Sequence, residues 1–357
     1  SRGASLYRPM IFDRELWGFD RQSSITERQY RLIAAAADAN ETKRVAPRLD
    51  LARFYLAREM YAEAKGVLDV TLAEDRPNAD NPAGLVLRAI ALIMLNRPEE
   101  ALKDLNHPLL GELHDAPLWR AFANARLGKY EEARRGFKNV ESAIAMQPIE
   151  MQRVALRESL RTAIEIRDYA GAQNLLNEFD TVGRPTEMQP SLAVLQGRLL
   201  QGLGKSQDAM RNFRIAADSH DRPSSAQGQL RNLAMRYEIG ELKRAEMIGE
   251  LETLTTVWRG DETEIEALHK LARLYTEEQR FRDAFYVMRS ALKAHPNAQM
   301  TRRIQDEAAV TFDSLFLAGR GDVLPAIDAL SLFYDFRELT PIGRRGDEMI
   351  RRLADRL

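Results

Sequence analysis

The chain has 357 residues, of which 45% are hydrophobic and 29% are charged, so it can form a packed core and is not typical of a disordered protein. Its 52 basic and 53 acidic residues give a formal net charge of −1, which argues against general binding to nucleic acid or anionic membranes, because both require excess positive charge. The absence of cysteine excludes disulfides, zinc–thiolate sites and cysteine nucleophiles.

The first predicted element is an aromatic N-terminal segment, residues 1–24. We expect it to be extended and to dock on the first helices, because the open end of a helical array needs a cap. A second interpretation is an arm that binds a partner. The aromatic residues of this segment are Tyr7, Phe12, Trp17 and Phe19. A helix is predicted next, over residues 25–40, where Ser24 and Glu27 have the spacing of a capping box.

A short pattern then recurs along the chain: an alanine, an aromatic residue three positions before it, and a bulky apolar residue four positions after it. Tyr61, Ala64 and Leu68 form the first clear copy. In six of eight copies the residue twelve positions before the alanine is small, which allows two helices to approach closely. The eight alanines, separated by 37, 32, 39, 37, 36, 39 and 42 residues, are Ala64, Ala101, Ala133, Ala172, Ala209, Ala245, Ala284 and Ala326.

Each copy is predicted to be a pair of helices joined by a tight turn. Most copies end at a proline, the last at Pro341, because proline cannot continue a helix. Gly128 and Gly204 fall between the helices of their pairs, where a left-handed residue is expected. No segment has the alternating pattern of a strand. The predicted second helices cover residues 61–74, 98–106, 130–146, 169–180, 205–219, 242–257, 281–294 and 322–334, and a final helix covers 346–357.

These units resemble the tetratricopeptide repeat (TPR) family. The resemblance covers about residues 46–357, although several units exceed the family's length of 34 residues. It implies an all-α fold: a right-handed superhelix, or α-solenoid, of about eight antiparallel helix pairs within residues 25–357. The last helix would begin a further repeat. The best copy contains Leu271, Ala272, Tyr275, Phe281, Ala284, Met288, Ala291 and Pro296.

Motifs with possible catalytic or binding chemistry are better explained by structure. Gly202–Ser206 resembles the end of a phosphate-binding loop, but Leu199 occupies the position of its first glycine and a helix, not a strand, precedes it. Arg-Gly-Asp occurs at 259–261, 320–322 and 345–347, where a left-handed glycine and a capping aspartate would join helices. The five histidines have no helical metal-binding spacing. We therefore predict no catalytic residue, cofactor or metal site.

One pattern points to a binding face. In the TPR family the first helices line the concave groove. In this chain, the position eleven residues before the repeat alanine is arginine in four of the first seven copies. Arginine binds carboxylates through two parallel hydrogen bonds, so these arginines favour an acidic peptide or a chain-terminal carboxylate as the ligand. Acidic residues on the same helices could instead pair with these arginines. The predicted groove residues are Arg53, Ile90, Phe122, Arg126, Arg157, Arg161, Arg198 and Arg273.

The predicted function is a non-catalytic scaffold for protein–protein interaction, within a larger protein that extends beyond this chain. The alternative is a superhelical arm of a multidomain enzyme, for example a cell-wall lytic enzyme, whose catalytic domain is not in this chain. We expect no nucleic-acid partner, because the charges are balanced. We also expect no direct insertion into a membrane, because no apolar run approaches the ~20 residues of a membrane span. The absence of cysteine favours a periplasmic or otherwise exported bacterial protein, and the alternative is a cytoplasmic one.

Overall fold

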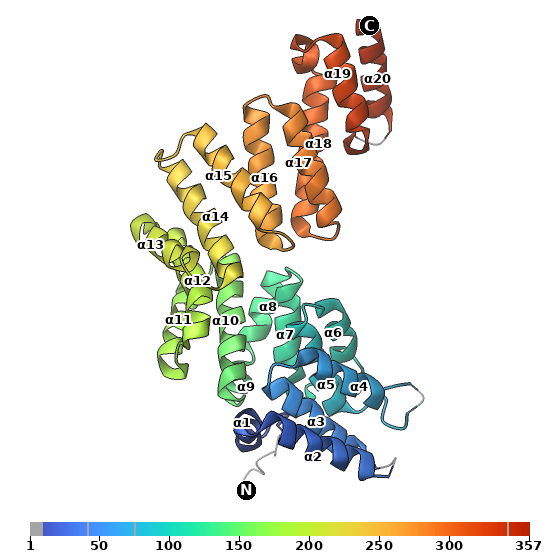
Figure 1. Ribbon diagram of the computed structural model, residues 1–357, viewed down its shortest axis with the longest axis vertical. Helices are drawn as coiled ribbons and strands as arrows, with labels where there is room; N and C mark the ends of the chain where they lie inside the picture. The colour runs from blue at the N-terminus through green and yellow to red at the C-terminus, as the bar shows by residue number, and fades with distance from the viewer. Residues whose placement is uncertain (1–9, 41–42, 75, 341–342) are drawn as a thin grey trace. The chain divides into compact units, whose positions relative to one another are not determined.

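The computed structural model describes residues 10–40, 43–74, 76–340 and 343–357 (Figure 1). Within these ranges every regular element is helical, and no strand is present. The helices pack consecutively along the chain, as expected for an α-solenoid, and form two compact units. Unit 1 is Ser1–Pro185 and unit 2 is Thr186–Leu357. No helix in the described residues is both long and apolar enough to cross a bilayer.

Unit 1 begins with two helices outside the pairs and continues with four helix pairs, one of which has a broken second helix. The helices of unit 1 are α1 (Arg14–Gln22), α2 (Ile25–Asp38), α3 (Val45–Ala57), α4 (Tyr61–Thr71), α5 (Pro82–Met94), α6 (Pro98–Leu105), α7 (Ala116–Arg126), α8 (Tyr130–Lys138), α9 (Glu141–Ala145), α10 (Ile149–Glu165) and α11 (Tyr169–Val182).

Unit 2 contains four further pairs, followed by a last helix that packs on both members of the fourth pair. The helices of unit 2 are α12 (Gln189–Gly202), α13 (Ser206–Ala217), α14 (Arg222–Glu238), α15 (Arg244–Val257), α16 (Glu262–Glu277), α17 (Phe281–Ala294), α18 (Gln299–Phe316), α19 (Ala326–Asp335) and α20 (Arg344–Arg356).

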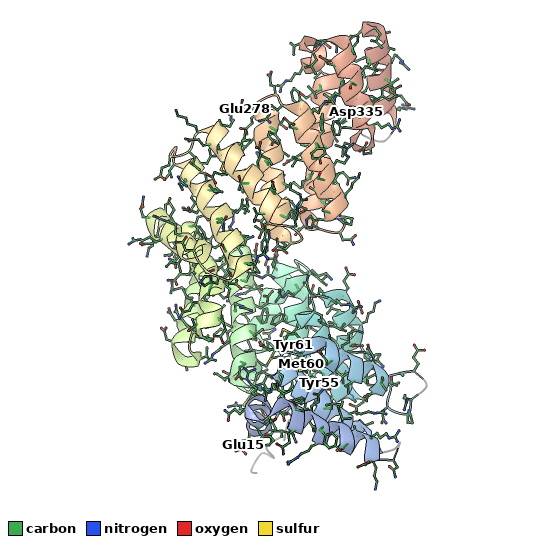
Figure 2. The ribbon with its side chains drawn as sticks, viewed as in Figure 1. Glu15, Tyr55, Met60, Tyr61, Glu278 and Asp335 are labelled. Carbon is green, nitrogen blue, oxygen red and sulfur yellow. The ribbon has the colours of Figure 1, made fainter. Side chains whose placement is uncertain are left out.

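The turns inside the first seven pairs share one geometry. In each turn, the residue five positions before the repeat alanine has a positive φ between 58° and 80°. The next amide then donates to the carbonyl five residues earlier; for example, Met60 N lies 2.8 Å from Tyr55 O. Figure 2 labels Tyr55 and Met60, which lie on either side of this turn. This bond closes the end of the first helix in a Schellman motif. The left-handed residues are Glu59, Asn96, Gly128, Arg167, Gly204, Gly240 and Gln279, which include both predicted glycines.

The repeat alanines of six copies are fully buried, as expected if they face a neighbouring helix. A close approach is clearest where both helices carry small residues. A Cβ added to Gly136 of α8 would lie only 2.8 Å from the Cβ of Ala121 in α7. Small side chains therefore set the distance between paired helices, as the sequence pattern predicts.

The sixth and eighth copies depart from the predicted register. Ala245 is exposed, because residues 241–243 separate its turn from the start of α15, and Ile248 is buried on that helix instead. In the eighth copy, Ala329 is fully buried rather than Ala326. Here Pro325 delays the start of α19, since residues before a proline disfavour helical geometry.

The first helices of the pairs form a continuous row in each unit. In unit 1, α3, α5, α7 and α10 contact one another in succession, and α12, α14, α16 and α18 do so in unit 2. The second helices pack mainly on first helices and not on each other. Within each unit, the first helices therefore pack side by side, whereas the second helices do not. We call the exposed surface of each row the inner face of its unit.

Other expectations about local structure were wrong. Residues 14–22 form α1 instead of an extended segment, with the Asp13 side chain capping the helix by accepting from Leu16 N at 2.9 Å. The predicted helix over 130–146 is broken at Asn139 and Val140 into α8 and α9. Ser24 makes no side-chain capping bond. Tyr7 and Pro341 lie outside the described residues.

Of the three Arg-Gly-Asp sequences, only the first has the predicted geometry. Gly260 has φ of 100°, and the Asp261 side chain accepts from Thr263 N at 2.9 Å to cap α16. In the other two sequences the left-handed residues are Gly319 and Gly343, which precede the motifs.

Candidate functional site

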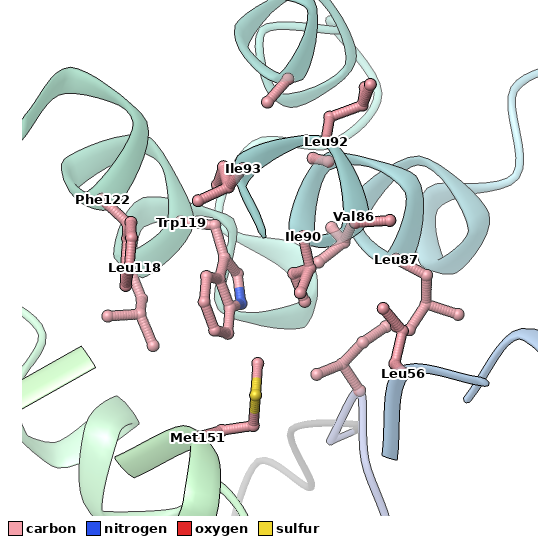
Figure 3. Packing of buried hydrophobic residues seen from close by; sticks show 14 of the residues in the cluster. Leu56, Val86, Leu87, Ile90, Leu92, Ile93, Leu118, Trp119, Phe122 and Met151 are labelled. Atoms are coloured by element: carbon pink, nitrogen blue, oxygen red, sulfur yellow. The ribbon is translucent and has the colours of Figure 1, made fainter. Parts of the chain in front are cut away.

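Two of the predicted groove residues are core residues. Ile90 and Phe122 both have 0% exposed surface and pack with Trp119 and Met151 inside unit 1 (Figure 3). A partner cannot touch them in this structure, so their assignment to a binding surface was wrong. The repeat register placed them correctly on α5 and α7. It could not reveal what covers those positions.

Three of the predicted arginines in unit 1 gather around one buried carboxylate. Glu158 of α10 is 4% exposed; its Oε1 lies 2.5 Å from Arg161 Nη2 and 3.8 Å from Arg126 Nε. Burial alone would raise the pKa of the Glu158 carboxyl, but the charges of Arg161, Arg126 and Arg157 outweigh burial and lower it. The arginines at the centre of this face therefore balance an internal charge.

Further contacts hold Arg161 in place. It donates to Ala125 O at 3.1 Å and to the Tyr130 hydroxyl at 3.3 Å, and its guanidinium lies 5.4 Å from the centre of the Tyr130 ring. Arg157 is half-buried and interacts electrostatically with Tyr61, whose pKa burial raises to about 12. Arg161 and Arg157 thus help to build unit 1.

Arg53 contacts the N-terminal segment. Its Nε donates to Ile11 O at 2.9 Å, and its Nη1 lies 3.1 Å from Asp50 Oδ1. The structure thus places Arg53 and the Glu158 cluster on the same row of helices. The alternative that acidic residues of the same helices pair with these arginines holds for Arg161, whose partner Glu158 lies three residues before it on α10.

The inner face of unit 2 carries a second charged group. Arg198 of α12 and Arg231 of α14 act electrostatically on Glu266 of α16, with Lys270 also nearby. Glu266 is half-buried, and burial raises the pKa of its carboxyl more than these positive charges lower it. Three successive first helices therefore meet at this charged group.

A neighbouring group joins α16 to α18. His269 Nε2 lies 2.7 Å from Glu307 Oε2, and Arg303 Nε lies 3.5 Å from Glu307 Oε1. Burial lowers the pKa of the His269 imidazole in spite of its bond to Glu307. Arg273 lies near His269 and is exposed, as are Lys270 and Arg303. Lys270 and Arg273 are thus exposed cations of this inner face, and Arg303 is an exposed cation paired with Glu307.

A cavity of about 200 Å³ lies between α14 and α15. Leu233 of α14 and Leu254 of α15 line it, and Leu233 stands where most copies have a small residue. Arg222 and Trp258 line the cavity, and the Arg222 guanidinium lies 5.7 Å from the centre of a Trp258 ring. No cluster of side chains suited to a metal ion is found in the described part of the chain.

Together the stacked hairpins and their inner faces define the class of protein: a TPR-like α-solenoid whose first helices present charged surfaces. Neither a scan against protein-family models nor a search of curated proteins found a match. Among solved structures, the chain is similar to a monomeric mutant of IFIT1 solved with m7Gppp-AAAA, at 14% identity and a TM-score of 0.58. The similarity covers 95% of this chain and 79% of that chain and shows the fold alone.

A second structure found by this comparison is the P58(IPK) TPR domain. It is 16% identical, and the alignment covers 87% of this chain and 97% of that chain. Its TM-score of 0.27 is too low to support an argument.

Proposed function

We propose that the chain is a non-catalytic scaffold that binds a protein or peptide segment on the inner face of unit 2. The observation that supports this proposal is the set of exposed cations on two successive first helices, Lys270 and Arg273 on α16 and Arg303 on α18. Packing of the solenoid does not need these side chains, because the buried residues of α16 lie on its other faces.

The proposed ligand is an acidic segment. Positive charges from four successive first helices, α12, α14, α16 and α18, lie around Glu266 and His269. They belong to Arg198, Arg231, Lys270, Arg273 and Arg303. Burial raises the pKa of the Glu266 carboxyl in spite of the positive charges around it. An approaching carboxylate would meet two or three donors from neighbouring helices.

The test compares two double charge reversals in the same unit. Lys270→Glu/Arg273→Glu changes the inner face, and Arg211→Glu/Arg214→Glu changes exposed residues of α13, a second helix. Proteins are captured from native lysate on each variant and on the unmodified chain, and are quantified by mass spectrometry. We expect the inner-face variant to lose captured proteins at least fivefold, while the α13 variant keeps them. Equal capture by both variants would refute the assignment to this face.

A second assay distinguishes a protein from a nucleic acid as the partner. IFIT1 was solved with m7Gppp-AAAA, so RNA is the alternative that this structural similarity suggests. A labelled oligoribonucleotide is titrated with the chain at increasing salt concentration. Our proposal expects no binding at physiological salt. Binding that weakens steeply with salt and is lost in Lys270→Glu/Arg273→Glu would instead assign this face to RNA.

A further inference from the structure

The end of the N-terminal segment, residues 11–21, lies across the inner face of unit 1. Helix α1 packs on α3 (Figure 1). Its side chains also reach the end of α9 and Glu150 of α10. Since α3 and α10 are the first and last members of the inner row, the segment spans the whole row of unit 1. It therefore occupies the surface on which a TPR-like solenoid would hold a partner.

Apolar side chains anchor the segment. Ile11, Phe12 and Trp17 are only 1%, 2% and 5% exposed and belong to the core of unit 1. The Phe12 and Trp17 rings meet edge to face, with their centres 4.8 Å apart and their planes at 69°. Phe19, on the same helix, is more than half exposed. The segment is thus amphipathic, with one anchored side.

Polar contacts fix the segment at both ends of the row. Trp17 Nε1 donates to Glu150 Oε2 at 3.0 Å, and Arg21 Nε lies 3.0 Å from Glu150 Oε1. At the α3 end, Arg21 Nη1 donates to Ala57 O at 2.7 Å. One carboxylate of α10 therefore receives both an indole and a guanidinium from the segment.

Arg14 contacts the end of α9. Its Nη2 donates to Ala145 O at 2.9 Å, and its Nε donates to Met146 O at 3.2 Å. The last carbonyls of a helix lack partners within the helix and carry partial negative charge, so they favour an arginine.

The inner face of unit 1 thus offers an apolar surface with acceptors at Glu150, Ala57 and the end of α9. Arg53 and Arg58 donate to backbone carbonyls of the segment, at Ile11 O and Asp20 O. The acceptors suit a ligand that carries aromatic anchors and arginines.

We propose that the inner face of unit 1 is a binding site for helical segments that carry two aromatic anchors and arginines. In this structure the site is filled by residues 11–21 of the chain itself. A partner protein presenting a segment of the same chemistry binds there by displacing this occupant. This site does not depend on the function proposed for unit 2, because the ligand chemistry and the residues involved are different.

The test uses the full chain and a labelled synthetic peptide of residues 10–23. In the variant Phe12→Ala/Trp17→Ala the resident segment loses its anchors, and we expect this variant to bind the peptide at least tenfold more tightly than the unmodified chain. In the unmodified chain the tethered segment competes at high effective concentration. Binding is measured by fluorescence anisotropy. Adding Glu150→Arg to the variant should abolish binding, as should both alanine substitutions in the peptide.

A second variant keeps the test valid if loss of the anchors impairs folding. Arg14→Ala/Arg21→Ala removes polar contacts only, and helix content by circular dichroism monitors the fold of each variant. We expect this variant also to bind the peptide more tightly than the unmodified chain. The proposal is overturned if neither folded variant binds the peptide more tightly than the unmodified chain, or if Glu150→Arg leaves binding unchanged.

Discussion

Gly228 is the position where the close packing of helices can be tested most directly. It lies within α14, and a Cβ added to it would lie 2.5 Å from Phe213 O and 2.6 Å from Ala217 N of α13. Ordinary contacts of a Cβ begin near 3.4 Å, so Gly228→Ala requires α13 and α14 to separate by about 0.9 Å. Both neighbours are backbone atoms, which cannot rotate away as a side chain would.

The expected change in stability follows from two opposing effects. Overpacking of this kind costs about 1–3 kcal/mol. Alanine in place of glycine inside a helix returns roughly 0.5–1 kcal/mol. Because the clash involves backbone on the facing helix, we expect a cost near the upper limit and a net destabilisation of about 2 kcal/mol. That value corresponds to roughly a 30-fold increase in local opening.

Hydrogen exchange measured by mass spectrometry is the appropriate assay, because stability in a solenoid is a sum of local terms. Amides of α13 and α14 should exchange faster in Gly228→Ala. Gly249→Ala is the matched control, since Gly249 also lies within a helix and an added Cβ there meets nothing within 4 Å. The control should slow exchange in α15. If Gly228→Ala also slowed exchange, the argument from close helix packing would be refuted.

Two further substitutions test the turns and the buried charge. Gln279 has φ of 58°, so Gln279→Gly should relieve left-handed strain and stabilise unit 2 by about 1 kcal/mol, seen as a higher denaturant midpoint. Glu158→Gln should destabilise unit 1 by about 3 kcal/mol at pH 7, because it leaves Arg161 buried without its carboxylate. The pKa of Glu158 lies below its ordinary value of 4.5, so its stabilising effect is complete above that pH and is lost as the pH falls further. Unfolding of Glu158→Gln and the unmodified chain should therefore converge in acid; a constant difference would contradict the pairing.

The sequence by itself determined the helix pairs of this protein. An alanine, an aromatic residue and a small residue at fixed spacing encode a contact between adjacent helices, and such a contact depends on a few tens of residues. The sequence pattern therefore predicted the first residues of α4, α8 and α17 to within one position. It failed where bulky or inserted residues replaced the pattern, as at Ala245.

The turns mark the limit of local information. Gly128 and Gly204 were recognisable as left-handed residues because glycine adopts that conformation without strain. Glu59, Arg167 and Gln279 take the same conformation, and nothing in their chemistry indicates it. Their φ angles follow from the packing of the two helices that each turn must join.

Only the tertiary structure decided which inner-face residues remain accessible. Arg161 is paired with Glu158 inside unit 1, while Arg273 at the equivalent repeat position of unit 2 is exposed. The contact between Trp17 and Glu150 joins residues 133 positions apart, and it brings the N-terminal segment onto a face that the repeat pattern predicts to be open. A periodic sequence encodes contacts between neighbouring helices, but occupation of a surface depends on residues that meet only when the chain is folded.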